Sequence, residues 1–333
     1  MNEQFIEVND LVQAAQNIVI LQADNPDGDS VASSLALEAI LLDMDKNPIM
    51  VCSTDIPSYL SYLPGYDRIV KDIPQSFDLT IIVDTSTESL FESSVNATGM
   101  QWVKTKPVIV LDHHASSNGI SFATVSVIED VVATGQLIYN IAHDQNWPLP
   151  QDACTMLVSS ILSDSLGLTT PTTSPDSFYV VGELVRLGVD IPALEAARRR
   201  SHEKDIDLLH YKGELLSRVE LSANNQLASV TVPWKEIEEY SPRYNPTMLA
   251  IDDMRLITGV RIAIGYKVYN TDRITAKIRC NYGYPIAAKL AEKFGGGGHE
   301  YAAGFKILDG TSIDDIKSQV NEIATQLLEE VHE

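Results

Sequence analysis

The sequence is poor in cysteine and contains no long apolar run. Its three cysteines, Cys52, Cys154 and Cys280, are far apart, and none belongs to a Cys-x-x-Cys pair. This spacing argues against a disulfide framework and a thiolate zinc site, and it fits a reducing compartment. No apolar run approaches the roughly 18 residues of a membrane span, and the acidic start MNEQFIEVNDLVQ does not resemble a signal peptide. The sequence therefore predicts a cytoplasmic protein without a membrane partner.

Basic residues are also scarce. The 24 lysines and arginines face 46 aspartates and glutamates, which gives a formal net charge of −22. Such a surface repels polyanions, so long duplex nucleic acid held through phosphate contacts is excluded as a partner. A small phosphorylated ligand at a local metal site remains compatible with this charge.

The length predicts two domains. The chain has 333 residues, of which 44% are hydrophobic and 21% charged, a balance that supplies apolar surface for two cores. We expect an N-terminal domain over residues 1–190, a helical linker over 191–218 and a smaller C-terminal domain over 219–333.

The N-terminal domain alternates apolar runs with helical patterns. Continuous apolar runs of this length are typical of strands covered on both faces, and they alternate with amphipathic segments such as residues 31–44 and 134–143. The predicted strands are residues 17–23, 47–53, 79–85 and 107–113. This order predicts an α/β fold with a doubly wound parallel sheet, whose ligands bind at the carboxyl ends of the strands.

The C-terminal domain has a different pattern, typical of a smaller mixed α/β sheet. The predicted strands are residues 227–234, 259–270, 273–280 and 304–308, and the predicted helices are residues 245–257, 285–294 and 312–331. We expect the active site in a cleft between the two domains.

Acidic residues and histidines follow the predicted strands. Asp27 and Asp29 stand in Asn-Pro-Asp-Gly-Asp-Ser after the first strand, and Asp84 ends the third. Carboxylates so close together suit a divalent cation, although Asp and Ser also favour plain turns and helix caps. Asp112-His113-His114 ends the fourth strand and adds imidazole, a ligand for transition metals.

Two later motifs complete the candidate site. Asp164 lies where a polar run breaks a helical segment, a position that an ordinary helix end would also explain. The run Gly295-Gly296-Gly297-Gly298-His299 leaves backbone N–H groups open to an anion, with Arg279 on the preceding strand. A flexible hinge is the alternative, and phosphate binding is the better explanation.

Together these motifs, in this order, resemble the DHH phosphoesterase superfamily with its C-terminal DHHA1 domain. The resemblance covers nearly the whole chain. It is closest to short two-domain members that act as nanoRNases, 3′-phosphoadenosine 5′-phosphate (pAp) phosphatases, or phosphodiesterases of cyclic-di-AMP and the linear dinucleotide pApA. It implies a hydrolase acting on short nucleotides and a homodimer.

The resemblance implies a two-manganese centre, with magnesium or another divalent ion as alternatives. Asp27 and Asp84 match the ligands of one ion. Asp29, Asp84, His113 and Asp164 match those of the other, so that Asp84 bridges the two.

The resemblance also assigns residues to the substrate. His114 matches a histidine that contacts the scissile phosphate, and Asp112 would orient the histidine pair. Arg279, Gly295–Gly298 and His299 match the clamp for a substrate phosphate.

The sequence departs from the family pattern at Ala23. The family usually has a histidine there that completes the first metal site, and alanine cannot bind a metal. Lys277 and Cys280 stand where the family commonly has serines. The alternative function is therefore a nucleotide-binding sensor with weak or no turnover. A third reading, a DHH inorganic pyrophosphatase, is disfavoured by the glycine-rich loop, because that group carries a different C-terminal domain.

Overall fold

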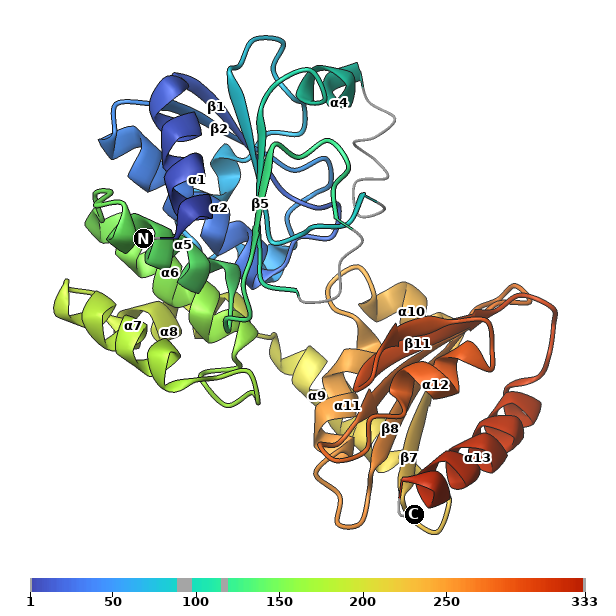
Figure 1. Ribbon diagram of the computed structural model, residues 1–333. Helices are drawn as coiled ribbons and strands as arrows, with labels where there is room; N and C mark the ends of the chain where they lie inside the picture. Colours follow the sequence, from blue (N-terminus) through green and yellow to red (C-terminus); the bar gives the residue numbers. More distant parts are fainter. Residues whose placement is uncertain (1, 89–97, 115–118, 332–333) are drawn as a thin grey trace. The chain divides into compact units, whose positions relative to one another are not determined.

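The chain divides into two compact units. The computed structural model describes residues 2–88, 98–114 and 119–331 (Figure 1). The first unit covers residues 1–203 and the second covers residues 204–333. Because the positions of the units relative to one another are not determined, each is described by itself.

The predicted linker, residues 191–218, contains two helices. Helix α8 (Ile191–Ser201) belongs to the first unit, whereas α9 (Ile206–Ser217) contributes Leu208 and Leu215 to a core of the second. The boundary between the units therefore lies between these two helices.

The first unit contains a five-stranded sheet in the order β2-β1-β3-β4-β5, and all its strand pairs are parallel. The strands are β1 (Asn17–Leu21), β2 (Asn47–Val51), β3 (Leu79–Val83), β4 (Val108–Asp112) and β5 (Val125–Ile128). The parallel sheet is confirmed, and β5 is a strand that the sequence analysis missed. The chain reverses its direction of travel across the sheet between β1 and β3, which is where such sheets bind ligands.

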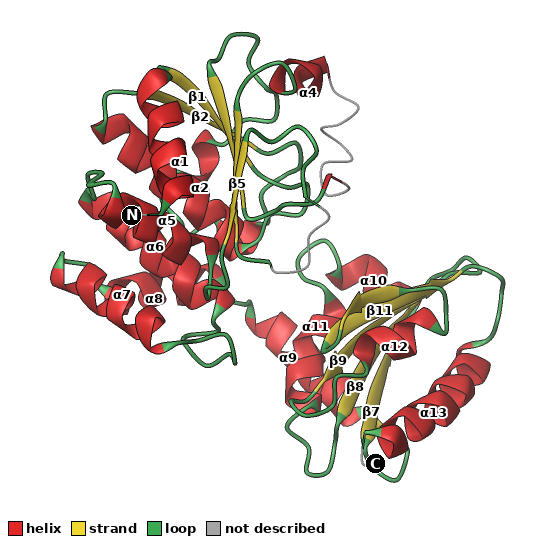
Figure 2. Cartoon of the chain, viewed as in Figure 1, coloured by secondary structure: helices red, strands yellow, loops and turns green. Residues whose placement is uncertain are grey.

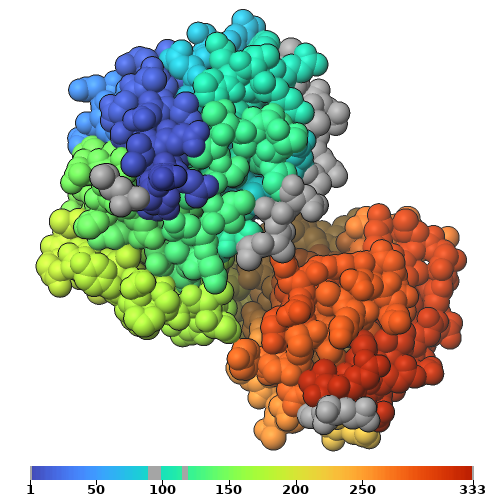
Figure 3. Space-filling view, viewed as in Figure 1, coloured from blue at the N-terminus to red at the C-terminus, as the bar shows by residue number. Residues whose placement is uncertain are grey.

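Helices cover both faces of this sheet, as Figure 2 shows. The helices are α1 (Glu3–Ala14), α2 (Gly28–Asp43), α4 (Thr98–Val103), α5 (Thr134–Asp144), α6 (Gln151–Asp164), α7 (Pro175–Arg186) and α8. Side chains alternate between two cores along β1: Ile18 and Ile20 face α1, α2, α5 and α6, whereas Val19 and Leu21 face α4. On the surface in Figure 3, α1 (dark blue) lies beside green segments of the same unit. Trp147 Nε1 donates to Asn9 Oδ1 of α1 at 2.9 Å.

Helix α2 approaches α6 very closely at its first residue. A methyl group on Gly28 would lie 2.0 Å from Ser163 Oγ, so only glycine fits there. This contact brings the beginning of α2 against the end of α6, and the acidic residues beside Gly28 and Ser163 come together as a result.

The second unit contains a six-stranded sheet in the order β10-β11-β9-β8-β7-β6, in which only the β7–β8 pair is parallel. The strands are β6 (Glu220–Ser222), β7 (Leu227–Val232), β8 (Ile262–Val268), β9 (Ile274–Cys280), β10 (Gly297–His299) and β11 (Ala302–Ile307). The predicted mixed sheet is confirmed, with β6 and β10 in addition.

Helices pack on both faces of the second sheet. The helices besides α9 are α10 (Trp234–Tyr240), α11 (Pro246–Met254), α12 (Ala287–Glu292) and α13 (Ile313–Glu330). Helices α12 and α13 bury one face, whereas α9, α10 and α11 cover part of the other. Among the described residues, no helix is long and apolar enough to cross a membrane.

Candidate functional site

The first unit gathers five of the predicted ligand residues at the carboxyl ends of its strands. Asp27 and Asp29 follow β1, Asp84 follows β3, His113 follows β4, and Asp164 ends α6. The Nε2 atom of His113 lies 3.6 Å from Asp29 Oδ2, 3.6 Å from Asp84 Oδ1 and 3.7 Å from Asp164 Oδ2. One imidazole nitrogen therefore faces three carboxylates that belong to three different segments.

These distances fit a shared cation better than direct hydrogen bonds. Nδ1 of His113 lies 3.2 Å from the carbonyl oxygen of Val131, so a proton on Nδ1 donates there and leaves the lone pair of Nε2 facing the carboxylates. This buried Nε2 has no hydrogen-bond partner among the described residues. A cation with bonds of about 2.1 Å holds neighbouring ligand atoms about 3.0–3.4 Å apart, close to the observed spacing. Ligand atoms of Asp84, His113 and His114 also lie within 4.8 Å of one another.

Asp29 is fixed by three hydrogen bonds, one from its own helix and two from other helices. Ser33 Oγ donates to Oδ1 at 2.9 Å and Ser160 Oγ donates to the same oxygen at 2.6 Å. The backbone N–H of Thr134 donates to Oδ2 at 2.8 Å. The side chain is 1% exposed, so α2, α5 and α6 together determine where its carboxylate points.

Asp84 is held in a strained conformation. Its φ angle of 59° is left-handed, a region that few residues other than glycine adopt. Thr134 Oγ1 donates to its Oδ1 at 3.1 Å. Burial, and then the charges of Asp29 and Asp27, raise the pKa of Asp84 well above its usual range. The metal-free site is therefore electrostatically unfavourable.

Asp164 and Asp27 share this unfavourable environment. Burial and the charge of Asp29 raise the pKa of Asp164 to about 6. Asp164 is also the last residue of α6, where the helix dipole disfavours a negative charge. Asp27 caps α2 by accepting from the N–H groups of Asp29 and Ser30, and burial raises its pKa.

Asp112 and His114 form a hydrogen-bonded pair beside this cluster. Nδ1 of His114 lies 2.7 Å from Asp112 Oδ1, and Ser86 Oγ donates to Asp112 Oδ2. Burial alone would raise the pKa of Asp112, but the bonds from His114 and Ser86 hold it below its usual value. The same bond raises the pKa of His114, whose side chain is 55% exposed. Asp112 thus holds the His114 ring in one orientation.

The second unit brings its predicted residues to one pocket of about 710 Å³. Arg279, Gly295–Gly298 and His299 all line it, together with Lys267 and Lys277. Among the described residues, no carboxylate lies within 4.0 Å of the charged groups of these two lysines or of Arg279. Desolvation lowers the pKa values of these three side chains. The charge of Lys277 further lowers the pKa of Lys267, and the charge of Arg279 further lowers the pKa of Lys277. The pocket is thus a cationic surface in an acidic protein.

Glycines shape the floor of this pocket. A methyl group on Gly296 would lie 2.2 Å from the carbonyl oxygen of Gly304, and Gly298 has a φ angle of 143°. Lys277 is paired with Gly265 on one side and Gly304 on the other, so no neighbouring side chain crowds it within the sheet.

The comparisons with known proteins agree with this architecture. Residues 17–161 match the DHH family, N-terminal domain. The matched segment extends from β1 into α6, so the likeness to the DHH family lies within the first unit.

Relatives of the chain extend over both units. It is 23% identical over 314 residues to the "bifunctional oligoribonuclease and PAP phosphatase NrnA" of Bacillus subtilis, covering 93% of this chain and 95% of that protein. It is 25% identical over 176 residues to a "probable manganese-dependent inorganic pyrophosphatase" of Lactobacillus acidophilus, covering 50% and 53%. An exopolyphosphatase-related protein from Bacteroides fragilis has the same fold, with a TM-score of 0.84, 20% identity and coverage of 98% and 97%.

The sequence analysis of the first unit missed the groups that orient its acids. Ser33, Thr134 and Ser160 bind Asp29 or Asp84, and Ser86 binds Asp112. A signal was present, because small hydroxyl residues interrupt the otherwise apolar helical segments 31–44 and 153–162.

The departure from the DHH pattern at position 23 is visible in the structure. Ala23 lies two residues beyond β1, is 8% exposed, and its carbonyl oxygen accepts from Cys52 Sγ at 3.5 Å. It offers no ligand atom from its side chain.

Proposed function

We propose that this protein is a metal-dependent phosphoesterase that hydrolyses short nucleotides. One observation carries the proposal: Nε2 of His113, which has no hydrogen-bond partner among the described residues, faces the carboxylates of Asp29, Asp84 and Asp164. The names of the relatives from Bacillus subtilis and Lactobacillus acidophilus describe phosphoester and pyrophosphate hydrolysis, and the latter names manganese.

The ligand roles are those of the family. Asp27 and Asp84 would hold one divalent cation, and Asp29, Asp84, His113 and Asp164 would hold a second. When bound, two such ions lower the pKa of a water molecule and neutralise phosphoryl oxygens. The hydrogen bonds to Asp29 fix its carboxylate before any ion binds, so binding requires little rearrangement of this ligand.

His114 supplies a proton to the reacting phosphate. Asp112 accepts from Nδ1 of His114 and favours its charged form, which leaves the Nε2–H group to donate to a phosphoryl or leaving oxygen. Asp112 therefore acts through His114 rather than on substrate.

The pocket of the second unit selects substrates with a further phosphate. Arg279 is suited to a terminal phosphate, and Gly297, Gly298 and His299 lie at the same pocket. The expectation that the whole glycine run offers open N–H groups is wrong for Gly295 and Gly296, which donate to the carbonyl oxygens of Glu292 and Ala291 at 3.0 and 2.9 Å. Such an anchor favours short substrates such as pApA, oligoribonucleotides of up to about five residues, pAp or cyclic-di-AMP. Ala23 supports the second candidate, a sensor that binds these nucleotides with negligible turnover.

The test is manganese-dependent hydrolysis of these four substrates by the wild type, Asp29→Ala and Asp144→Asn. Asp144 ends α5 and serves as a matched acid outside the cluster. We expect turnover in the wild type and Asp144→Asn, and its loss in Asp29→Ala or in EDTA. Turnover that survives Asp29→Ala contradicts the assigned metal centre. Tight binding without hydrolysis of any substrate supports the sensor, and Ala23→His would then be the variant to assay.

A further inference from the structure

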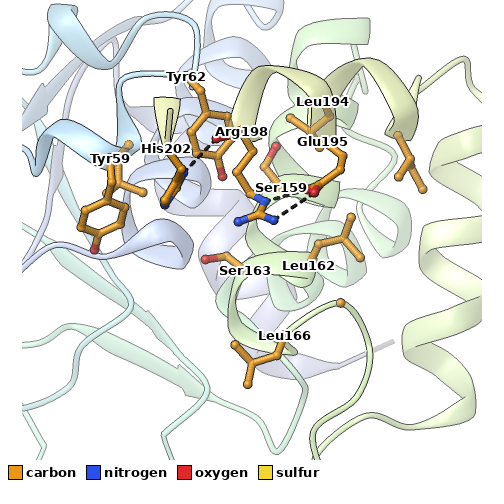
Figure 4. A pocket seen from close by; sticks show the side chains of 13 residues that line it. Tyr59, Tyr62, Ser159, Leu162, Ser163, Leu166, Leu194, Glu195, Arg198 and His202 are labelled. Atoms are coloured by element: carbon orange, nitrogen blue, oxygen red, sulfur yellow. Dashed lines mark hydrogen bonds and ion pairs between the residues drawn. The ribbon is translucent and has the colours of Figure 1, made fainter. Parts of the chain in front are cut away.

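A second cavity, of about 630 Å³, adjoins the metal cluster within the first unit (Figure 4). It is formed by the 3-10 helix Ser58–Leu60, the end of α6 and helix α8. Ser163 lines it and immediately precedes Asp164, and the same Ser163 contacts Gly28, which follows Asp27. The wall of the cavity therefore lies beside the residues Asp27 and Asp164, two of the proposed ligands.

Apolar side chains form much of its wall, and two large side chains in it are exposed to solvent. Tyr59 is 44% exposed and Leu166 is 74% exposed. Leu166 also has a φ angle of 50°, and Leu168 has one of 65°, although leucine rarely adopts this region. Ser165 Oγ accepts from the N–H of Leu168 at 2.7 Å, which helps to fix the loop. The fold thus holds an exposed apolar side chain beside the cluster at a cost in backbone strain.

A guanidinium group contributes to the polar part of the wall, to which Ser163, Glu195 and His202 also belong. Arg198 donates from Nε and Nη2 to Glu195 at 2.6 and 3.0 Å, and Figure 4 shows its guanidinium pointing into the cavity. Arg198 has five N–H donors, so this pair leaves others for a ligand. Flat apolar surface with a few polar groups suits a planar ring with acceptors on its edge.

We propose that this cavity binds the base of the nucleotide that carries the scissile phosphate. The inference rests on the proposed function, because that function places a nucleotide at the adjoining metal cluster. The volume is within the range of about 300–1,000 Å³ that small-molecule sites occupy. The faces of the base would contact Tyr59 and Leu166.

The experiment measures binding without turnover. Calorimetry in EDTA compares adenosine 5′-monophosphate with ribose 5-phosphate, which carries the same phosphate and no base. The proteins are the full-length wild type, Tyr59→Ala, Leu166→Asn and the control Leu187→Asn. Asparagine tolerates the left-handed backbone at position 166, and Leu187 is an exposed leucine that does not line the cavity.

Stacking of one base contributes enough for a difference of about five-fold or more. We expect the wild type and Leu187→Asn to bind the adenosine nucleotide that much more tightly than the sugar phosphate. Tyr59→Ala and Leu166→Asn should reduce the ratio towards one. A ratio near one in the wild type, or an unchanged ratio in both cavity variants, overturns the inference.

Hydrolysis separates this inference from the proposed function. If the wild type hydrolyses nucleotides but the binding ratio is unchanged in Tyr59→Ala and Leu166→Asn, the cavity inference alone is wrong. If no nucleotide is hydrolysed and the ratio still depends on these residues, the cavity binds a base and the phosphoesterase proposal is wrong.

Discussion

Replacing Asp164 with asparagine should stabilise the metal-free protein while weakening metal binding. In the folded state, burial and the charge of Asp29 raise the pKa of Asp164 from 3.8 to about 6. One pKa unit corresponds to about 1.4 kcal/mol, so the full shift corresponds to about 3 kcal/mol. Because the side chain is 35% exposed, solvent screening reduces the expected gain to about 1–2 kcal/mol.

The gain should depend on pH in one direction. The folded pKa lies above the unfolded one, so the charged carboxylate destabilises the fold fully above about pH 6 and has little effect below about pH 4. The stability difference between Asp164→Asn and the wild type should therefore fall to about a third between pH 8 and pH 4.5.

Urea unfolding in EDTA at both pH values measures this difference. Asp144→Asn is the control, since it makes the same change at the last residue of α5 and should change stability by less than about 0.5 kcal/mol. With manganese at about 100 times its dissociation constant, the wild type should gain about 2.7 kcal/mol and Asp164→Asn clearly less. An Asp164→Asn protein that is less stable than the wild type in EDTA at pH 8 would refute the reasoning.

Three further predictions concern the acidic cluster of the first unit and the cationic pocket of the second. Asp84→Asn should keep the fold, because asparagine tolerates a φ angle of 59°, but it should lose the rise in Tm that manganese produces. If thermal scans of this variant still show the rise, Asp84 is not a ligand. Ser160→Ala should weaken manganese binding about 10–100-fold in calorimetry, because Asp29 loses the hydroxyl that donates to it at 2.6 Å. An unchanged affinity would show that the hydrogen bond from Ser33 is enough to orient Asp29. Lys277→Ser should weaken pyrophosphate binding in EDTA about five-fold or more, because it removes a cation from the anion pocket, the pocket of the second unit that Lys277 and Arg279 line. Equal binding by the variant and the wild type would show that Lys277 does not contact the anion.

Much of the first unit could be predicted from the sequence because buried parallel strands have a strong signal. The apolar run 17–23 predicts β1, which ends at Leu21, two residues earlier, where the chain turns towards Asp27. Parallel strands with acids after them must bring those acids to one edge, so the approach of His113 to Asp29 follows from topology. Strand β5 was missed because it has only four residues, one of which is exposed.

The residues that orient the ligands could not be predicted in the same way. Ser160 is fully buried, yet the hydroxyl residues that interrupt its helical segment do not show from the sequence which of them contacts Asp29. Its role depends on the close approach of α2 and α6 at Gly28, which is a tertiary contact. Likewise, Lys267 reaches the anion pocket through the pairing of β8 with β9, a register that composition does not specify.

The energetics of the acidic cluster support the proposed cation site. Burial and mutual repulsion raise the pKa values of Asp27, Asp84 and Asp164, so in their charged forms these groups destabilise the metal-free fold. A sensor that held its ligand through the glycine loop and Arg279 would not need these charges. Hydroxyl and backbone N–H donors hold the carboxylate of Asp29 in one orientation. An apolar or amide side chain at this position would avoid the electrostatic cost of a buried charge. Such an arrangement is physically reasonable when a cation neutralises the cluster, even though Ala23 contributes no ligand.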